Sequence, residues 1–262
     1  MSSNEQLIQI RYSNKKEDKR AFYSRTAGLE FHYTKKVLEN FIDKQSQIIE
    51  IGCGTGYYGL YFSQKCKEYT GIDLVPENIE VFNQKIADSK ITNIITMVGD
   101  ATKLINIKNN EYDIVLSLGP MYHLPPNERD LAFIEAKRIC KENGIVVFAY
   151  QNKLGAYLQS GILSNPNLYP NEKANEYILV KETDEESPGL FYFTTPEEIA
   201  ERAKLHGFSV IKNIGINYFF NSEQINNMDE EKFRCWLEFS DYLCESESCT
   251  GLSVHALLIC KN

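Results

Sequence analysis

The residues with the clearest chemical potential lie in one short stretch, residues 48–56. An apolar run ends in Glu50, and the chain then reads Gly-Cys-Gly-Thr-Gly from Gly52 to Gly56. Because glycine has no Cβ, such a loop can bend tightly and let a ligand approach the backbone. An apolar strand that turns through glycines into a helix is where open α/β sheets bind nucleotide-like ligands. The stretch therefore predicts a ligand site at one edge of a sheet.

The glycines allow two interpretations. Residues 54–59 form a Gly-x-Gly-x-x-Gly, which is the fingerprint of dinucleotide binding. This fingerprint starts two residues late, because the apolar run ends at Ile51 and the next residue is already Gly52. Counted from Gly52, the sixth position is Tyr57 rather than glycine. An NAD-dependent oxidoreductase is therefore kept as the weaker alternative.

Apolar strands alternate with amphipathic helices on both sides of this loop. This order predicts an α/β fold: a seven-stranded, mostly parallel, doubly wound sheet with right-handed crossovers and an antiparallel edge strand. Strands are expected at 48–51, 69–74, 91–100, 112–120, 145–150, 208–217 and 252–262. Helices are expected at 29–42, 57–66, 76–90, 127–140 and 196–207, the last capped by Thr195 with Glu198 three residues on.

Residues 151–190 interrupt the alternation. This insert contains a possible strand at 176–182 and the acidic run Glu182–Glu186. Aromatic residues flank it and recur between the last two strands, where they can line a pocket or bury the insert against the sheet. They are Tyr150, Tyr157, Tyr169, Tyr177, Phe191, Tyr192, Phe193, Tyr218, Phe219 and Phe220.

Composition narrows the class of protein. The 262 residues carry a net charge of −8, which argues against a partner held mainly through phosphate contacts. The seven cysteines are scattered, and Cys235, Cys244 and Cys249 lack a CxxC pair or a nearby histidine, so no metal site is predicted. No apolar stretch reaches the length of a membrane span, and the polar start is no signal peptide. We therefore expect a soluble, cytoplasmic protein that does not bind membranes.

Four motifs in order resemble those of the class I (Rossmann-like) S-adenosylmethionine-dependent methyltransferases. The loop that starts at Glu50 resembles the first motif, and Asp73, 23 residues later, matches the acidic second motif. Asp100 ends the third strand where this family places an acidic residue near adenine. Residues 112–124 and 141–150 resemble its fourth and fifth strands. The resemblance spans roughly residues 29–150 and implies S-adenosylmethionine as the cofactor.

The resemblance also implies roles for the loop residues. Gly52 and Gly54 would pass close to the methionine part of the cofactor, and Glu50 would steady the loop. Cys53 would serve as a small residue in a tight turn, since nothing nearby in the sequence lowers the pKa of its thiol.

Further along the chain, Asp73 and Leu74 would frame the ribose and adenine. Asp100 and Ala101 would meet the adenine edge, and Leu118 would offer backbone groups to the cofactor. The resemblance assigns these residues to cofactor binding because each follows a strand whose carboxyl end faces the ligand.

Other residues are assigned to the remaining ends of the site. Arg25 is a candidate partner for the cofactor carboxylate, because arginine binds carboxylates in a bidentate manner, and Tyr12 could close over the same end. His123 and Tyr122 are the candidate catalytic residues, because the loop after the fourth strand lies at the carboxyl edge. A purely structural role for this pair remains open.

The resemblance divides the chain into a methyltransferase domain, residues 1–150 and 191–262, and a cap insert, residues 151–190, over the acceptor site. Residues 1–28 would form an N-terminal lid. No Asn-Pro-Pro-Tyr or Pro-Cys motif of nucleic-acid methyltransferases follows the fourth strand, so a small-molecule acceptor is favoured over nucleic acid. A non-catalytic protein that senses S-adenosylmethionine is the alternative. The sequence does not indicate the acceptor atom or the oligomeric state.

Overall fold

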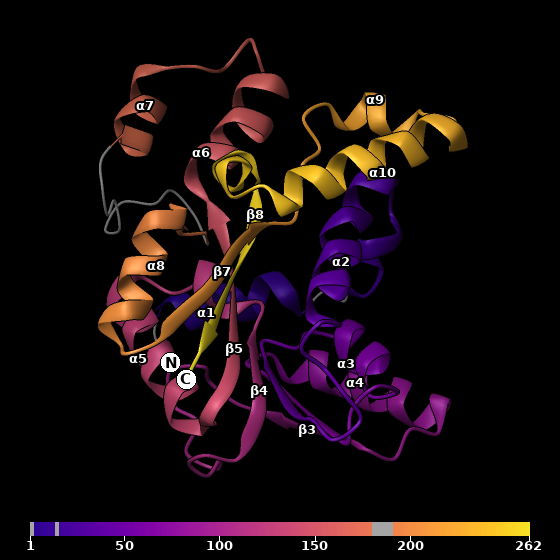
Figure 1. Cartoon of the computed structure of the whole chain (residues 1–262), viewed down its shortest axis with the longest axis vertical. Coiled ribbons are helices and arrows are strands. Elements are labelled where there is room, and N and C mark those ends of the chain that lie inside the picture. The colour runs from indigo at the N-terminus through magenta and orange to yellow at the C-terminus, as the bar shows by residue number, and fades with distance from the viewer. Residues whose placement is uncertain (1–2, 14–15, 180–190) are drawn as a thin grey trace.

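A computed structural model describes residues 3–13, 16–179 and 191–262 (Figure 1). One sheet, in the order β3-β2-β1-β4-β5-β8-β7, forms the centre, and a short strand, β6, pairs with β5. The strands are β1 (Gln47–Ile51), β2 (Glu68–Asp73), β3 (Ile94–Val98), β4 (Tyr112–Ser117), β5 (Cys140–Asn152), β6 (Phe193–Thr194), β7 (Ser209–Gly215) and β8 (His255–Lys261).

Helices surround this sheet. They are α1 (Ser3–Tyr12), α2 (Arg25–Leu38), α3 (Tyr57–Phe62), α4 (Pro76–Ser89), α5 (Pro126–Ile139), α6 (Lys153–Ala156), α7 (Glu172–Leu179), α8 (Pro196–Leu205), α9 (Ser222–Asn226) and α10 (Glu230–Glu245). Shorter turns are the 3-10 segments η1 (Lys16–Phe22), η2 (Pro120–Tyr122) and η4 (Glu247–Leu252) and the π-helix η3 (Tyr157–Leu163).

The sheet confirms the predicted fold class. Strands β1 to β5 pair in parallel, while β8 runs antiparallel to both β5 and β7. The antiparallel strand therefore lies one place in from the edge, and β7 forms the edge itself. Because β8 is reversed, its first residue, His255, lies beside Gln151 at the carboxyl end of β5.

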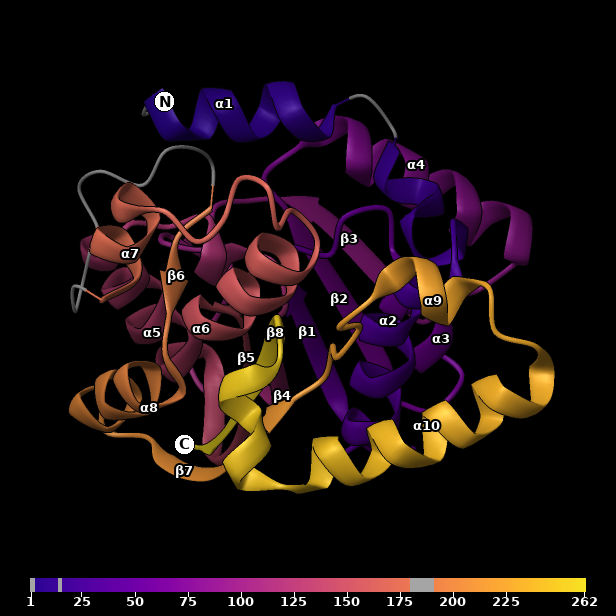
Figure 2. The same cartoon turned by 90° about the horizontal axis from the view of Figure 1, so that it is seen from above.

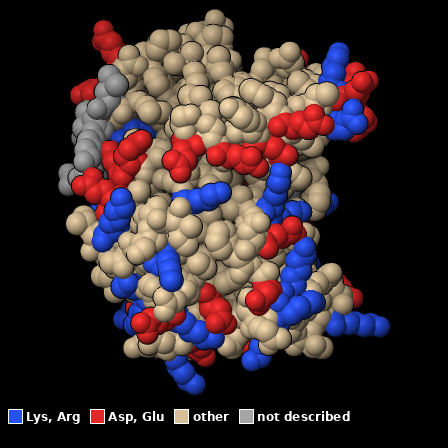
Figure 3. Space-filling model, viewed as in Figure 1, with Lys and Arg blue, Asp and Glu red and all other residues tan. Residues whose placement is uncertain are grey.

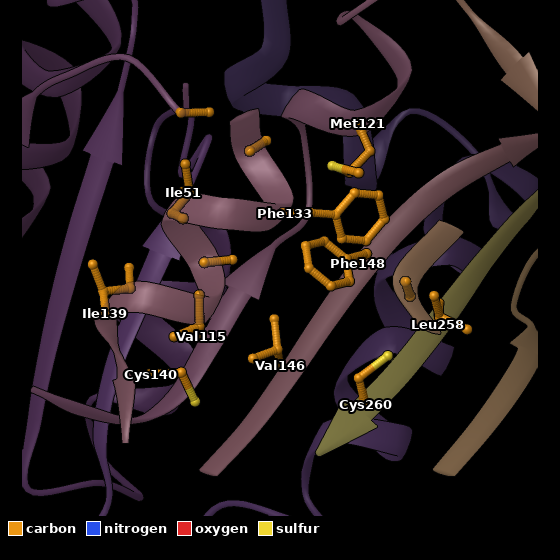
Figure 4. Close-up of a cluster of buried hydrophobic side chains, with 14 of the residues drawn as sticks. Ile51, Val115, Met121, Phe133, Ile139, Cys140, Val146, Phe148, Leu258 and Cys260 are labelled. Atoms are coloured by element: carbon orange, nitrogen blue, oxygen red, sulfur yellow. The ribbon is translucent and has the colours of Figure 1, made fainter. Parts of the chain in front are cut away.

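Alternate residues of the central strands bury opposite faces of the sheet, as a doubly wound fold requires. On β5, Val146 and Phe148 pack with α5 and α8, whereas Val147 and Ala149 pack with α2 and α3. Figure 4 shows the first of these clusters, where Phe133 of α5 lies against Phe148 with ring centroids 4.5 Å apart. Both faces of the central strands are therefore buried. The packed helices hold these strands in place, and with them the strand ends that form the site.

The insert differs from its prediction in one place. The possible strand at 176–182 is wrong where the structure describes it, because residues 172–179 form helix α7. No strand of the sheet pairs with this segment, and Asn171 instead accepts a hydrogen bond from the Ala174 amide at 2.9 Å, which starts a helical turn. The acidic run Glu182–Glu186 lies outside the described residues.

The predicted capping of α8 is confirmed, whereas α10 has no counterpart among the predicted elements. Thr195 and Glu198 form a reciprocal capping box at the start of α8. Helix α10 passes beside α2 (Figure 2), where the Tyr33 hydroxyl donates to the Leu237 carbonyl at 3.1 Å and Lys36 pairs with Asp241 at 2.7 Å. This packing holds α2 in place above the sheet.

Surface charge is mixed on the face seen in Figure 3. Acidic side chains form a band across its upper half, and Lys and Arg side chains are dispersed between carboxylates elsewhere on it. No helix in the described part of the chain is long and apolar enough to cross a membrane.

Candidate functional site

A cavity of about 390 Å³ opens at the carboxyl edge of the sheet. It crosses the point between β1 and β4 where the strand order reverses, which is where doubly wound sheets bind ligands. Its volume lies within the usual range for small-molecule sites. The lining residues are Ile8, Arg11, Tyr12, Arg20, Glu30, Phe31, Glu50, Ile51, Gly52, Cys53, Gly54, Thr55, Tyr57, Tyr58, Asp73, Leu74, Val75, Asn78, Gly99, Asp100, Ala101, Leu118, Gly119, Pro120, Tyr122, His123, Leu124, Gln151, Phe191 and His255.

The glycines of the loop have different surroundings. Gly52, Gly54 and Gly56 all have positive φ, at +79°, +53° and +84°. A Cβ on Gly54 would meet no atom within 4 Å, so this backbone borders open cavity space. A Cβ on Gly52 would lie 2.7 Å from the Pro120 ring, and one on Gly56 would lie 2.0 Å from the Phe82 ring. Gly54 is therefore the glycine that a ligand can approach, and Gly56 belongs to the packing of α4.

Asp73 fixes the shape of the loop from the end of β2. Its Oδ2 accepts a hydrogen bond from the Gly54 amide at 2.7 Å, and its Oδ1 accepts from the Val75 amide at 2.9 Å and from Asn78 Nδ2 at 3.1 Å. Burial raises the pKa of this carboxyl, and the three donors oppose that rise. A carboxylate has about four lone-pair sites, so Asp73 keeps capacity to accept from a ligand hydroxyl.

Glu50 lies at the base of the cavity, 1% exposed. The Tyr69 hydroxyl donates to its Oε2 at 2.6 Å. Burial raises the pKa of Glu50 to about 8, with a smaller contribution from the charge of Asp73. Glu50 is therefore protonated at neutral pH in the ligand-free protein.

The third strand supplies the far end of the cavity. Asp100 and Ala101 line it directly after β3, together with Leu74 after β2. Asp100 Oδ1 accepts hydrogen bonds from the amide and the hydroxyl of Thr102, at 2.8 and 2.9 Å, which fix the carboxylate in one orientation.

Cys53 lies in the tight turn and lines the cavity, but its thiol is 5% exposed and lies 3.7 Å from the Gly54 carbonyl oxygen. Burial raises the pKa of this thiol, and the nearby Glu50 and Asp73 add to the rise. The reactive form of a cysteine is the thiolate, so this environment disfavours a nucleophilic role.

The predicted catalytic pair follows β4. The Tyr122 hydroxyl donates to the Leu118 carbonyl at 3.2 Å, and the His123 ring Nε2 lies 2.9 Å from the Tyr12 hydroxyl of α1. Gln9, also on α1, donates to the Leu74 carbonyl at 3.4 Å. Helix α1 is therefore attached across the cavity at both the β2 and the β4 ends.

Arg25 is the predicted site residue that the structure places elsewhere. Its guanidinium donates to the Met228 carbonyl and to Glu230 and lies 4.4 Å from the Phe233 ring centroid. These partners hold Arg25 on the α9–α10 side of α2, and it does not line the cavity. The arginines that do line it are Arg11 and Arg20.

Other cavity residues were not among the predicted site residues. Glu30 on α2, Gln151 at the end of β5 and His255 at the start of β8 line the cavity together with Arg20. They come from distant parts of the chain and share no motif, so the sequence carried no signal for them. The reversed direction of β8 is what brings His255 to this edge.

The aromatic residues around the insert mostly bury it against the sheet. Tyr150 donates to Asn213 at 2.7 Å, and Tyr218 donates to the Cys249 carbonyl at 3.0 Å. Among the described residues of this group, Phe191 lines the cavity and the others do not. Helices α6, η3 and α7 likewise contribute no lining residue, and among the described residues of the insert, 151–179, Gln151 lines the cavity.

Comparison with known proteins agrees with this fold. A family model described as a methyltransferase domain matches residues 48–144. The chain is 27% identical over 146 residues to a malonyl-[acyl-carrier protein] O-methyltransferase of Anoxybacillus flavithermus, covering 55% of this chain and 52% of that protein. The chain thus spans about half the length of this curated relative.

Two further similarities extend over more of the chain. A ubiquinone biosynthesis O-methyltransferase of Pelagibacter ubique is 25% identical over 186 residues, covering 70% of this chain and 71% of that protein. The structure of magnesium protoporphyrin IX methyltransferase from Synechocystis, solved with bound S-adenosylhomocysteine, superposes with a TM-score of 0.61 at 12% identity, covering 99% of this chain and 100% of that one.

The fold and the edge cavity therefore define a doubly wound, Rossmann-like α/β protein. Within that class, residues 48–144 match the methyltransferase-domain family, and the whole chain shares the fold of solved methyltransferases.

Proposed function

We propose that this protein is an enzyme that transfers a methyl group from S-adenosylmethionine to a small-molecule acceptor. The observation that carries the proposal is the single cavity that runs from Asp100, past Asp73 and Gly54, to His123. A bound cofactor needs the first part of this cavity, and an acceptor needs the part beyond β4.

The residues of the first part fit the chemistry of S-adenosylmethionine. Asp73 keeps the capacity to accept from a ribose hydroxyl, and Asp100 lies at the end of the cavity where adenine would bind. Gly54 has open space where a Cβ would stand, as a close ligand approach requires. Asp100 has no assigned role in the dinucleotide alternative, so its place in the cavity favours S-adenosylmethionine.

The cofactor carboxylate needs a cation, and Arg11 lines the cavity, whereas Arg25 does not; Arg20 also lines it but is paired with Glu30. When bound, S-adenosylmethionine supplies an activated methyl group on a sulfonium sulfur. The protein then has to align the acceptor, exclude water and hold the geometry.

The proposal also divides the chain into a lid, a methyltransferase domain and an insert. Residues 1–28 form the N-terminal lid, and the hydrogen bonds of α1 to Leu74 and His123 across the cavity support this role. Residues 1–150 and 191–262 form the methyltransferase domain. The insert, residues 151–190, forms a cap at the acceptor end, where Gln151 lines the cavity and Phe191, directly after the insert, also lines it.

A small-molecule acceptor is favoured by charge and by shape. The chain has a net charge of −8, and the described charges on the face in Figure 3 form no continuous basic surface. Nucleic acids require such a surface to neutralise their phosphates. The named relatives are O-methyltransferases, one acting on malonyl-[acyl-carrier protein] and the other in ubiquinone biosynthesis, which supports a compact acceptor group.

The test is transfer of a labelled methyl group. The purified protein is incubated with methyl-labelled S-adenosylmethionine and with separate pools of phenols, carboxylic acids, amines, thiols and total RNA. The proposal expects label in one small-molecule pool. Label in RNA would contradict the choice of acceptor, and cofactor binding with no transfer to any pool would favour a non-catalytic sensor.

A further inference from the structure

The order of the strands separates the two halves of the cavity. Residues assigned to the cofactor follow β1, β2 and β3, whereas Gln151 and His255 lie at β5 and β8, on the other side of the reversal point. Neighbouring strands are about 4.8 Å apart, so β8 lies about 14 Å across the sheet from β1. His255 therefore belongs to the half of the cavity left for the acceptor.

His255 faces a carboxylate there. Its Nδ1 lies 3.9 Å from Glu30 Oε2, and the same oxygen accepts a hydrogen bond from Arg20 at 2.9 Å. The side chains of His255 and Glu30 are 16% and 11% exposed. The 3.9 Å separation is an electrostatic contact rather than a hydrogen bond, and such contacts in ligand-free sites commonly shorten when substrate binds.

The second ring nitrogen of His255, Nε2, has no hydrogen-bond partner among the described residues. It is not among the fully buried atoms, and His255 lines the cavity. The first, Nδ1, also lies 3.2 Å from the Asn217 side-chain amide. Either orientation of that amide leaves one of its two polar atoms buried without a partner, so Asn217 does not decide the tautomer. Glu30 decides the tautomer of His255, because a carboxylate attracts an N–H group on Nδ1 and repels a lone pair there.

We propose that His255 is the general base of the acceptor site, with Glu30 as the positioning residue that keeps the proton on Nδ1 and the lone pair of Nε2 toward the acceptor. This inference rests on the proposed methyltransferase function. His123 is less suited to the role, since its Nε2 is already bonded to Tyr12.

The arrangement selects an acceptor with an ionisable hydroxyl, such as a phenol or an enol. The acceptor oxygen forms a bond to the methyl carbon as the carbon–sulfur bond breaks, and the hydroxyl proton moves to Nε2 of His255. The imidazolium that results lies beside Glu30. The sulfonium becomes a neutral thioether, the acceptor becomes a methyl ether, and the positive charge is now on the imidazolium, so atoms and charges balance.

Charge and lining both favour such an acceptor over an amine. Glu30 is paired with Arg20, so this wall offers no excess negative charge to an ammonium group. Phe191, which packs beside Tyr122 and His123, lines the cavity and suits a flat, apolar body.

The groups that face His255 keep it neutral in the ligand-free protein. Burial lowers the pKa of His255, and Arg20 lowers it further, while Glu30 opposes both. Burial alone would raise the pKa of Glu30, but the positive charge and the hydrogen bond of Arg20 oppose burial, and that pKa lies below its usual value. The Tyr122 ring, with its centroid 6.2 Å from that of His255, is the aromatic neighbour from η2.

The experiment is ¹⁵N NMR of the full chain labelled on histidine and saturated with S-adenosylhomocysteine, with 4-nitrophenol as the acceptor probe. His255→Gln identifies the signals, and His32→Gln, on the outer side of the same helix as Glu30, is the matched control. We expect His255 in the Nδ1–H form, with its Nε2 signal moving toward the protonated position when 4-nitrophenol is added. Glu30→Gln should reduce the population of the Nδ1–H form.

An Nε2–H tautomer in the saturated protein would overturn the proposal, as would an Nε2 signal that 4-nitrophenol leaves unchanged. Calorimetry on the same samples distinguishes failure of the proposed methyltransferase function from failure of the proposed role of His255. Absence of S-adenosylhomocysteine binding would overturn the proposed function itself, whereas normal binding with the wrong tautomer would overturn the role of His255 alone.

Discussion

At the scale of single residues, Gly54 of the loop serves ligand binding, whereas Gly56 serves packing against α4. Gly54→Ala should weaken S-adenosylhomocysteine binding at least about tenfold, because its Cβ would occupy cavity space, with a strain cost of about 1–2 kcal/mol from its positive φ. Gly56→Ala should instead lower the free energy of unfolding by about 2–4 kcal/mol, because its Cβ would overlap the Phe82 ring. Calorimetry and urea unfolding measure the two effects. Equal loss of stability in both variants would contradict this division.

A second prediction at the residue scale concerns Glu50 and the pH dependence of the free energy of unfolding. Its pKa in the folded protein is about 8, above the value of 4.5 for the free side chain, so it favours folding fully only below pH 4.5. That contribution is lost as pH rises through 8, by an amount on the order of 4 kcal/mol. Relative to Glu50→Gln, the wild type should therefore lose stability between pH 5 and pH 9.

Urea unfolding at both pH values measures this difference, with the exposed Glu80→Gln as the control. A gap between wild type and Glu50→Gln that stays constant with pH would show that Glu50 is ionised throughout.

The sequence indicated the cofactor half of the site because its residues follow strands in a fixed order. Asp73, Asp100 and Gly54 are each local to a strand end, so chain position was enough to place them. Arg25 could not be placed in this way, since its partners are in α9–α10, some 200 residues later. Glu30 and His255 depend on how α2 and β8 pack, and no local pattern records that.

At the scale of elements, the attachment of α1 rests on few contacts. Tyr12→Phe removes the hydrogen bond to His123, which is worth about 1 kcal/mol net. We expect S-adenosylhomocysteine to dissociate about fivefold faster from this variant, because the lid opens more readily. Stopped-flow fluorescence measures the rate, and Tyr23→Phe, an exposed tyrosine, is the control. An unchanged dissociation rate would argue that α1 does not act as a lid.

Periodicity predicted the strands and helices that are buried in regular alternation. It missed α10 and misassigned residues 176–179, now in α7. Neither segment belongs to the alternating pattern of the sheet. Helix α10 is fixed by tertiary contacts with α2, such as the bond from Tyr33 to the Leu237 carbonyl, and contacts over that sequence distance leave no local signal.

At the scale of the whole molecule, the reversal of strand order between β1 and β4 determines where ligands bind, and the reversed strand β8 determines what the second half of the cavity contains. Both follow from chain topology rather than from any one motif. The same fold supports many reactions, so the acceptor has to be inferred from the residues of the cavity.

The most direct test of the account is calorimetric titration of the purified protein with S-adenosylmethionine, S-adenosylhomocysteine, NAD and NADH. The account predicts saturable binding of the first two and none of the nucleotides that contain nicotinamide. Binding of NADH without S-adenosylmethionine would contradict it and return the interpretation to the fingerprint at residues 54–59.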